Sequence, residues 1–468
     1  MDERQLIGLG GMAVLMLLLA LRLPVGLAML IVGVGGNYAL SIAAPYLRFW
    51  PFLKQFKTLF FANVATYELS VVPLFILMGF LAAQSGMSRD LFQGMRAAVG
   101  RVRGGVAMAA IAACAGFGAV CGSSIATAST MGRVALPELL RMRYAPRLAT
   151  GTLAAGGTLG ILIPPSVALI IYSLIVEASI IEMFQAAMLP GLLAVVLFIA
   201  VIAVLVRRNP ELAPQLDDLQ PSERAAALRR LVPILGLFGA IIGGLGAGLF
   251  TPTPAAAVGV FAVFAYGIIT RTRAPDGQLT AGLDRAGITH SVKQTAVTAG
   301  MITFILFGAE VLKTFFSRTG LPAALADWAA ASTLDPYAIL IAMLVVLIIL
   351  GCFLESLSMV LIVVPFFWPA LVSINGGDYV TAETAAFGLD NEQLKLWFGV
   401  LALVVIELGL ITPPVGLNVF VIAALARTIP IAETFRGVLP FFGVELFRVA
   451  VLLAVPGLCL WLPALLRN

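Results

Sequence analysis

At the centre of the first half of the chain stands Gly156-Gly157-Thr158-Leu159-Gly160-Ile161-Leu162-Ile163-Pro164-Pro165-Ser166, inside an apolar run over residues 148–176. A membrane-spanning helix has no hydropathic reason to stop within such a run. Two consecutive prolines, however, remove two backbone donors and clash with the preceding turn, and the glycines free the backbone to unwind. The stretch therefore predicts two half-helices joined by an irregular loop, over about 148–176.

A second stretch repeats this pattern in the other half of the chain, and it reads Ile406-Glu407-Leu408-Gly409-Leu410-Ile411-Thr412-Pro413-Pro414-Val415-Gly416-Leu417-Asn418. Gly160 and Gly409 are 249 positions apart, and so are the members of each matching proline pair. Paired interrupted segments in corresponding halves point to the binding site of a secondary transporter. We therefore expect a second interrupted helix over about 397–426, with structural breaks at Pro164, Pro165, Pro413 and Pro414.

The composition excludes a soluble globular protein. Hydrophobic residues make up 61% of the 468 residues and charged residues 11%, against roughly 45–50% and about 25% in soluble domains. The net charge of +5 does not indicate nucleic-acid binding, because the basic residues lie in short loops between apolar runs. The four cysteines form no CxxC pattern, which favours buried thiols over disulfides or metal ligands. The sequence predicts an all-α polytopic membrane protein.

The first half, residues 1–206, is expected to hold scaffold helices, a hairpin and the first interrupted helix. Its N-terminal apolar run is interpreted as a retained helix, since no cleavage site follows it. Residues 46–65 carry phenylalanines at helical spacing and are expected to lie at the membrane interface, as a lipid anchor or as a docking surface for a partner subunit. The hairpin, over about 104–140, has arginines at both ends, so we expect it to enter from the cytoplasm.

A polar linker over 207–230, rich in arginine and proline, separates the halves and is placed in the cytoplasm. The second half, residues 231–468, repeats the plan, with a loop over 321–336 and a hairpin over about 337–374. Acidic residues flank this second hairpin, so it is expected to enter from the periplasm. Five crossings per half would invert the second copy. The result is an inverted repeat with about ten membrane crossings and both termini in the periplasm.

The polar groups at the two hairpin tips and the two breaks predict a sodium site. Backbone carbonyls and hydroxyls of unwound segments supply the hard oxygen ligands that replace the water around such a cation. Non-helical backbone at membrane depth is tolerated only when it is buried in protein or lines a cavity. The candidate cation-binding residues are Gly122, Ser123, Ser124 and Thr127 on the first tip, Gly157, Thr158 and Gly160 on the facing loop, Glu355, Ser356 and Ser358 on the second tip, and Gly409, Thr412 and Gly416 at the second break.

A substrate carboxylate is expected near the same place. The half-helices that begin after Pro165 and Pro414 leave backbone donors free and carry partial positive charge at their N-termini. Ser166 and Asn418 lie at these starts and are the candidate substrate-binding residues. Arg133 follows the first tip and is a third candidate, although snorkelling to lipid headgroups would also explain an arginine there.

Other ionisable residues within apolar segments have two interpretations each. A carboxylate in such a segment is costly and is functional by default. Glu407 is therefore either a coupling residue or a structural bridge at the broken helix, and both interpretations stay open. Glu310 and Lys313 are three residues apart and are expected to pair. His290, the only histidine, is a weak candidate for a proton relay.

These motifs resemble those of a known family, the large membrane subunit (DctM type) of the tripartite ATP-independent periplasmic, or TRAP, transporters. The resemblance covers essentially the whole chain and implies an elevator-type, sodium-driven importer of organic acids in the bacterial inner membrane. It also implies a small four-helix membrane subunit (DctQ type), to which this chain is not expected to be fused, and a periplasmic binding protein (DctP type) that delivers the substrate. The residues that carry it are Gly122-Ser123-Ser124 with Ala126-Thr127, Gly156-Gly157-Thr158-Leu159-Gly160 through Pro164-Pro165-Ser166, and Leu408-Gly409 through Thr412-Pro413-Pro414-Val415-Gly416-Leu417-Asn418.

Two other functions are alternatives to a TRAP transporter subunit. A stand-alone sodium/dicarboxylate carrier or antiporter of related architecture would need no binding protein. An intramembrane enzyme is disfavoured, because the sequence holds no HExxH metal motif, no histidine beyond His290 for a Ser-His pair, and no glycine-rich phosphate loop. We therefore expect a transporter with no cofactor, in which sodium is the coupling ion.

Overall fold

The computed structural model describes residues 2–21, 23–214, 220–246, 248–273 and 279–466, and the regular secondary structure of these residues is helical apart from one two-stranded antiparallel sheet. Nine of the described helices are long and apolar enough to cross a membrane, or ten if α8 and α9, bent by 43° at their break, count as one span. The predicted all-α polytopic architecture is therefore confirmed. The nine or ten candidate spans among the described residues include α16 (Ser356–Asn375), which was expected as a hairpin limb, and do not include the interrupted helix expected over about 397–426.

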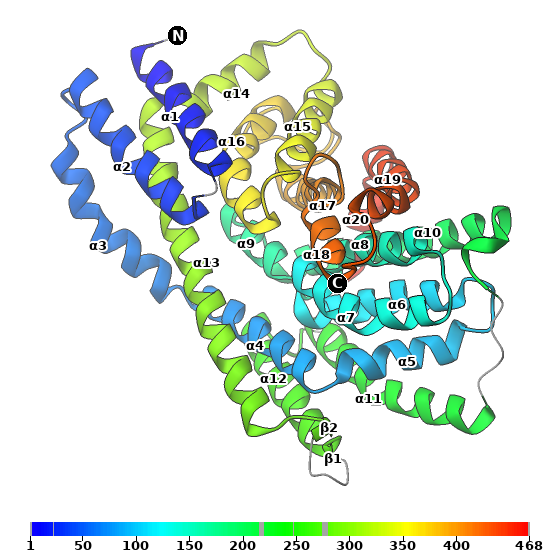
Figure 1. Cartoon of the computed structure of the whole chain (residues 1–468). Coiled ribbons are helices and arrows are strands. Elements are labelled where there is room, and N and C mark those ends of the chain that lie inside the picture. The colour runs from blue at the N-terminus through cyan, green and yellow to red at the C-terminus, as the bar shows by residue number, and fades with distance from the viewer. Residues whose placement is uncertain (1, 22, 215–219, 247, 274–278, 467–468) are drawn as a thin grey trace.

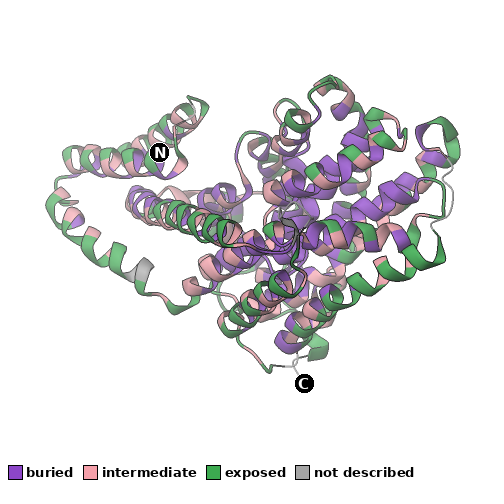
Figure 2. Ribbon diagram, turned by 60° about the horizontal axis from the view of Figure 1, so that its bottom comes forward, coloured by how far each residue is buried: buried purple, intermediate pink, exposed green. Residues whose placement is uncertain are grey.

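One group of helices forms an outer layer, with α2 packed along α13 and α4 packed against both α12 and α13 (Figure 1). Much of the surface of α1–α3 is exposed, as Figure 2 shows. The members of this outer group are α1 (Glu3–Ala20), α2 (Val25–Ala43), α3 (Phe49–Ala65), the short helix η1 (Tyr67–Ser70), α4 (Val71–Gln84), α11 (Pro221–Gly246), α12 (Pro252–Ile269), the strands β1 (Thr272–Arg273) and β2 (Leu279–Ala281), and α13 (Arg285–Thr319).

A second group forms the inner body and contains both hairpins and both interrupted helices. Its centre is made by α8 and α17, which are almost completely buried. The members of this inner group are α6 (Gly105–Cys121), α7 (Ser124–Arg141), α8 (Pro146–Leu162), α9 (Val167–Val176), α10 (Ile180–Arg208), η2 (Pro210–Leu212), α15 (Pro336–Gly351), α16 (Ser356–Asn375), α17 (Asn391–Gly409), α18 (Leu417–Leu425), α19 (Ile431–Ala454) and α20 (Gly457–Leu466).

Two helices connect the groups. The first, α5 (Met87–Val99), packs on α11 of the outer group and on α6 of the inner group. The second, α14 (Leu321–Ala331), packs on α13 and on α16. Each connecting helix directly precedes one of the hairpins, so the order of elements repeats in the two halves of the chain more closely than the sequence suggested.

The two hairpins also make the same close contact with the interrupted helices. Gly118 of α6 lies so near Gly160 of α8 that a Cβ atom on Gly118 would be 2.5 Å from the Gly160 Cα. In the second half, a Cβ on Gly409 of α17 would be 2.7 Å from the Gly351 Cα of α15. Only glycine permits backbones to approach so closely, which is typical of helix packing in membranes.

Several local predictions were wrong. α8 continues to Leu162, so Gly157, Thr158 and Gly160 lie in a helix and not in an unwound loop. Only residues 122–123 lie outside the helices at the first tip, and Thr127 belongs to the first turn of α7. Tight packing contacts explain the glycines of α8, whereas Gly122 at the first tip needs the backbone freedom of glycine because its φ is 62°.

The boundaries outside the apolar runs also differ from the prediction. The linker over 207–230 is partly helical, because α11 begins at Pro221 within a run of strong helix formers. The expected loop over 321–336 contains α14, which is rich in alanine and has a proline in its first turn. α13 begins at Arg285, several residues before the apolar part of this helix. Hydropathy marks where a helix enters the hydrocarbon and not where the helix itself begins.

The aromatic helix α3 packs partly on the protein itself. Its phenylalanines form edge-to-face contacts with one another, and Phe56 and Phe60 both contact Phe307 of α13 at 5.5 Å between ring centroids. Phe61 and Trp50, in contrast, are exposed. The expected pair on α13 is also present, with 4.0 Å between Lys313 Nζ and Glu310 Oε1.

Replacing Gly118 or Gly409 with alanine is expected to destabilise the inner body by about 1–3 kcal/mol, because each new methyl group would overlap backbone atoms. The measurement is the thermal unfolding midpoint of the purified protein in detergent. Gly239→Ala is the matched control, since a Cβ there meets nothing within 4 Å. Equal midpoints for Gly118→Ala and Gly239→Ala would contradict the packing assigned to the hairpins.

Candidate functional site

A cavity of about 360 Å³ lies between the outer and inner helix groups. The first hairpin tip contributes Gly122, Ser123 and Ser124 to its wall, and the second tip contributes Glu355 and Ser356. The remaining wall comes from residues of α4, α7 and α13, with a few from α6, α8, α9 and α16. The two tips, which are separated by more than 200 residues in the sequence, therefore meet at one cavity as predicted.

The cavity has a buried floor and an exposed rim. Ser124 and Ser356, at the tips, are 1% and 4% exposed. Arg133 on α7 and His290 on α13 also line the cavity, but both are exposed. The cavity therefore runs from the polar tips towards a rim with one permanent positive charge and one imidazole.

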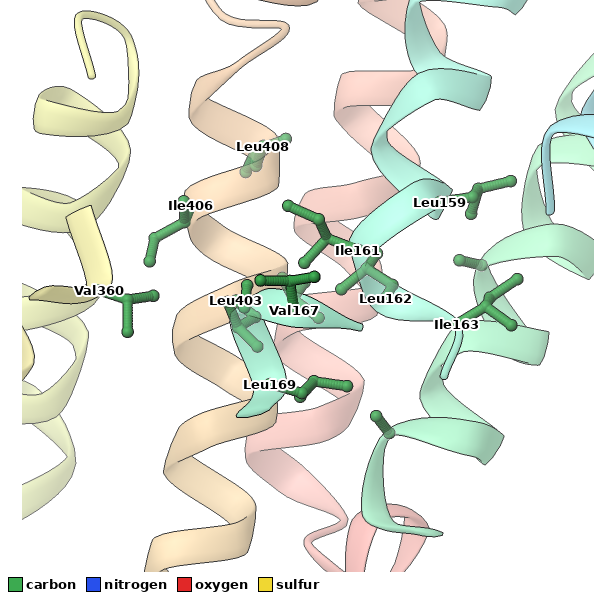
Figure 3. Close-up of a cluster of buried hydrophobic side chains, with 14 of the residues drawn as sticks. Leu159, Ile161, Leu162, Ile163, Val167, Leu169, Val360, Leu403, Ile406 and Leu408 are labelled. Carbon is green, nitrogen blue, oxygen red and sulfur yellow. The ribbon is translucent and has the colours of Figure 1, made fainter. Parts of the chain in front are cut away.

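The first break in the interrupted helix is fully covered by protein. Pro164 and Pro165 are joined by a cis peptide bond, and both are buried. Apolar residues of α8, α9 and α17 surround this break, as Figure 3 shows. Gly122, in a left-handed conformation with φ of 62°, packs directly on the start of α9.

The prolines also leave backbone acceptors free. In a regular helix the carbonyl groups of Gly160 and Ile161 would accept hydrogen bonds from residues 164 and 165. Both of these residues are prolines and have no N–H group. Within the described parts of the chain, no backbone donor from outside α8 replaces them. Two carbonyl oxygens at the end of α8 are thus available to a ligand or to water.

Glu407 joins the two hairpin tips. Its carboxylate is 1% exposed and lies in the last turn of α17. The Ser124 hydroxyl donates a hydrogen bond to Glu407 Oε2, and the Ser356 hydroxyl donates one to Oε1 at 2.7 Å. One buried carboxylate is therefore bound by a serine from each half of the chain.

A separate cluster of buried polar atoms lies behind the first tip. Thr127 Oγ1 and both polar atoms of the Asn418 side chain have no hydrogen-bond partner among the described residues. Two glycines of α8 admit these groups, since a Cβ on Gly157 would be 3.1 Å from Asn418 Nδ2 and a Cβ on Gly160 would be 2.5 Å from Thr127 Oγ1. The Ser123 carbonyl oxygen also faces Gly160, at 2.8 Å from the same added Cβ. Buried polar atoms without partners are rare and need an explanation.

Other predicted ligands are engaged in local hydrogen bonds. Thr158 and Thr412 donate to the carbonyl oxygens of Ala155 and Leu408, each at 2.6 Å. The oxygen of Ser166 caps its own helix by accepting from Leu169 N at 3.4 Å. Further local bonds link Ser123 to Ala126 and Ser358 to Glu355.

The predicted site residues therefore divide into three sets. The first lines the cavity, the second forms the buried polar cluster, and the third lies at the second break, where Pro413 and Pro414 are exposed and Gly416 begins α18 with φ of 62°. Asn418 was expected to bind substrate from the second break, but it lies beside Gly157 of the first half and does not line the cavity. Gly122, Ser123, Ser124, Arg133, Glu355 and Ser356 form the first set, Thr127, Gly157, Gly160 and Asn418 the second, and Gly409, Thr412 and Gly416 the third, while Thr158, Ser166 and Ser358 form only local hydrogen bonds and Glu407 lies between the tips.

The sequence analysis missed a buried ion pair on α19. Arg448 is completely buried and binds Glu445 Oε2 through Nε at 3.0 Å and through Nη2 at 2.5 Å. Its Nη1 donates to the carbonyl oxygen of Pro190 on α10 at 3.0 Å. A glutamate three residues before an arginine, inside an apolar run, is the signal that could have identified this pair.

A polytopic helical protein with two interrupted helices and two hairpins that meet at a central cavity has the architecture of a membrane transporter. The chain belongs to the family described as "Tripartite ATP-independent periplasmic transporter, DctM component", which matches residues 12–458. The family resemblance seen in the sequence is thus confirmed. The protein is the large permease component of a TRAP transporter.

Similar proteins agree with this assignment. The C4-dicarboxylate TRAP transporter large permease protein DctM of Pseudomonas aeruginosa is 32% identical over 85% of this chain and 86% of its own length. The sialic acid TRAP transporter large permease protein SiaM of Vibrio cholerae is 31% identical over 86% and 88%. The fold is similar to the crystal structure of the Alcanivorax borkumensis YdaH transporter, with a TM-score of 0.59, 18% identity and coverage of 86% and 88%.

Proposed function

We propose that this chain imports an organic acid by coupling its movement to a sodium gradient, and that a periplasmic binding protein and a small membrane subunit are its partners. The family is described as tripartite and ATP-independent, which supports two further components and a gradient as the energy source. The relatives named above carry C4-dicarboxylate or sialic acid, and both ligands contain a carboxylate. The observation that carries the proposal is that two different sites lie at the first tip. One is the buried polar cluster, and the other is the open cavity.

The buried polar cluster is the proposed sodium site. Neutral oxygen atoms are the ligands expected for this cation, and Thr127 Oγ1 and Asn418 Oδ1 are buried oxygens without a hydrogen-bond partner. The Ser123 carbonyl oxygen faces the same space. These residues would hold the ion, and its charge would lie beside the first tip. Asn418, which the sequence analysis expected to bind the substrate, is therefore proposed to bind the cation.

The cavity is the proposed site of the acid. Arg133 is on its rim, and among the described residues no carboxylate lies within ion-pair distance of this guanidinium. Its Nε donates only to the Ser129 carbonyl at 3.3 Å, which leaves the terminal nitrogens for a ligand. At the floor, the N-terminus of α7 directs partial positive charge towards the cavity. A carboxylate would be stabilised at both places.

An elevator movement of the inner group along α13 is part of the proposal. The cavity at the tips follows α13 from His290 to Ile302, and a second cavity of about 210 Å³ follows it from Leu306 to Lys313. Residues of α9 and α16 of the inner group line the other side of the second cavity. An inner group that slides along α13 needs cavities beside this helix at more than one position along its axis. The inverted orientation of the two halves, with the first hairpin facing the cytoplasm, is proposed from the loop charges.

A stand-alone carrier remains the second candidate, because both proposed sites are made by this chain alone. The discriminating experiment is uptake of a panel of labelled carboxylates into proteoliposomes that contain the chain and its small subunit. An inward sodium gradient with the binding protein present is expected to drive accumulation of one acid, and equal sodium on both sides is expected to abolish it. Accumulation independent of sodium would contradict the coupling, and accumulation without binding protein would favour the stand-alone carrier.

Variants of the two sites are expected to change different constants. Asn418→Ala should raise the sodium concentration for half-maximal uptake by about tenfold, at saturating acid, because it removes a buried oxygen ligand. Arg133→Gln should raise the KM for the acid by a similar factor at saturating sodium, with Arg133→Lys intermediate. Each variant is the control for the other. A change of both constants to the same extent in either variant would contradict the separation of the sites.

Cysteine labelling is expected to place the ends of the two hairpin regions on opposite sides of the membrane. Arg141 and Asp327 are both exposed, and each can be replaced by cysteine after the native cysteines are removed. A membrane-impermeant maleimide added to intact cells should label position 327 and should reach position 141 only after permeabilisation. Labelling of both positions from one side would exclude the inverted repeat.

A further inference from the structure

We propose that Glu407 is a positioning residue that ties the two hairpin tips to one another through α17. The proposed function requires two ligand sites but does not require that the tips be linked. The inference is therefore a further step, and only its sodium measurement rests on the proposed function.

The two serines that bind Glu407 occupy equivalent places in their hairpins. Ser124 is the first residue of α7 and Ser356 is the first residue of α16, so each begins the second limb of its hairpin. Each donates its hydroxyl to a different carboxylate oxygen. Both helix N-termini also direct partial positive charge towards the carboxylate. The side chain of Glu407 is thus recognised in the same way by each half of the chain.

No cation competes for Glu407 among the described residues. Its carboxylate forms no ion pair with a lysine or arginine there. The buried Arg448 is bound instead by Glu445 and by the Pro190 carbonyl. The hydroxyl groups of the two tips are consequently the direct partners that compensate for the burial of this carboxylate, and they are held in place by it.

The two limbs that begin at the tips, α7 and α16, share no extended interface with each other. α7 packs mainly on α8, and α16 packs mainly on α9 and α14. Both tips nevertheless form the floor of the same cavity, and the first tip also borders the buried polar cluster. A change in the spacing of the tips would therefore alter the cavity and the cluster at the same time.

The direct test measures this spacing without transport. Spin labels at Arg141→Cys and Ser373→Cys, near the far ends of α7 and α16, report the relative position of the two helices in a background without native cysteines. We expect one narrow distance distribution for the parent protein and for Glu407→Gln, whose amide can accept from one serine and donate to the other. Glu407→Ala is expected to broaden the distribution. An unchanged distribution in Glu407→Ala would overturn the proposal.

The second test measures the sodium concentration for half-maximal uptake by the folded protein. Glu407→Ala, Ser124→Ala and Ser356→Ala are expected to raise it by about tenfold each, and combining either serine variant with Glu407→Ala should add little, because both remove the same tie. Ser173→Ala is the control, since this buried serine only donates to Leu169 O within α9. A different outcome would be that Glu407→Gln requires as much sodium as Glu407→Ala while both serine variants behave as the parent protein. In that case the negative charge of Glu407, and not its link between the tips, would determine the sodium requirement, and the proposal would be overturned. Absence of sodium-driven uptake in the parent protein would refute the proposed function and leave the distance result as the test of the tie.

Discussion

The interior of a membrane offers no water to an unpaired backbone group, and this constraint governs how both helix breaks are built. At the first break, other parts of the protein cover the interrupted backbone, because Gly122 packs on the start of α9 and the prolines are buried. At the second break the loop satisfies itself, with Asn418 N donating to Leu410 O and Thr412 N to Gly409 O. Two segments with matching sequences thus differ, because the first break keeps the Gly160 and Ile161 carbonyl groups without a backbone donor among the described residues, whereas the second break forms hydrogen bonds within its own loop.

The chemistry of the site lies between the halves of the chain. Glu407 of the second half accepts from Ser124 of the first, and Asn418 of the second half lies beside Gly157 of the first. Neither half alone would hold a complete cavity or a complete polar cluster. The repeated order of helices matters for function because it brings unlike residues from equivalent positions to the same place. Exchange of one half for the other would not preserve the site.

Much of this architecture could be predicted from the sequence, because the features that carry it are local. A Pro-Pro pair breaks a helix wherever it occurs, and a polar tip between apolar limbs predicts a hairpin. The partners of Glu407 could not be predicted, since one of them is 283 residues away. The glycines near residue 160 were misread for a related reason. Glycine is favoured both where a backbone unwinds and where two helices pack closely. The position of the neighbouring helix, which the local sequence does not contain, distinguishes the two cases.

The length of α13 sets where the cavity meets its surroundings. Its 35 residues extend over about 52 Å, whereas the hydrocarbon layer is only about 30 Å thick. The polar first turns that precede the apolar part of this helix account for about 16 Å of the excess, and His290 lies on them. This histidine therefore stands at the level of the lipid headgroups or beyond. The cavity therefore reaches α13 at His290, outside the apolar part of this helix.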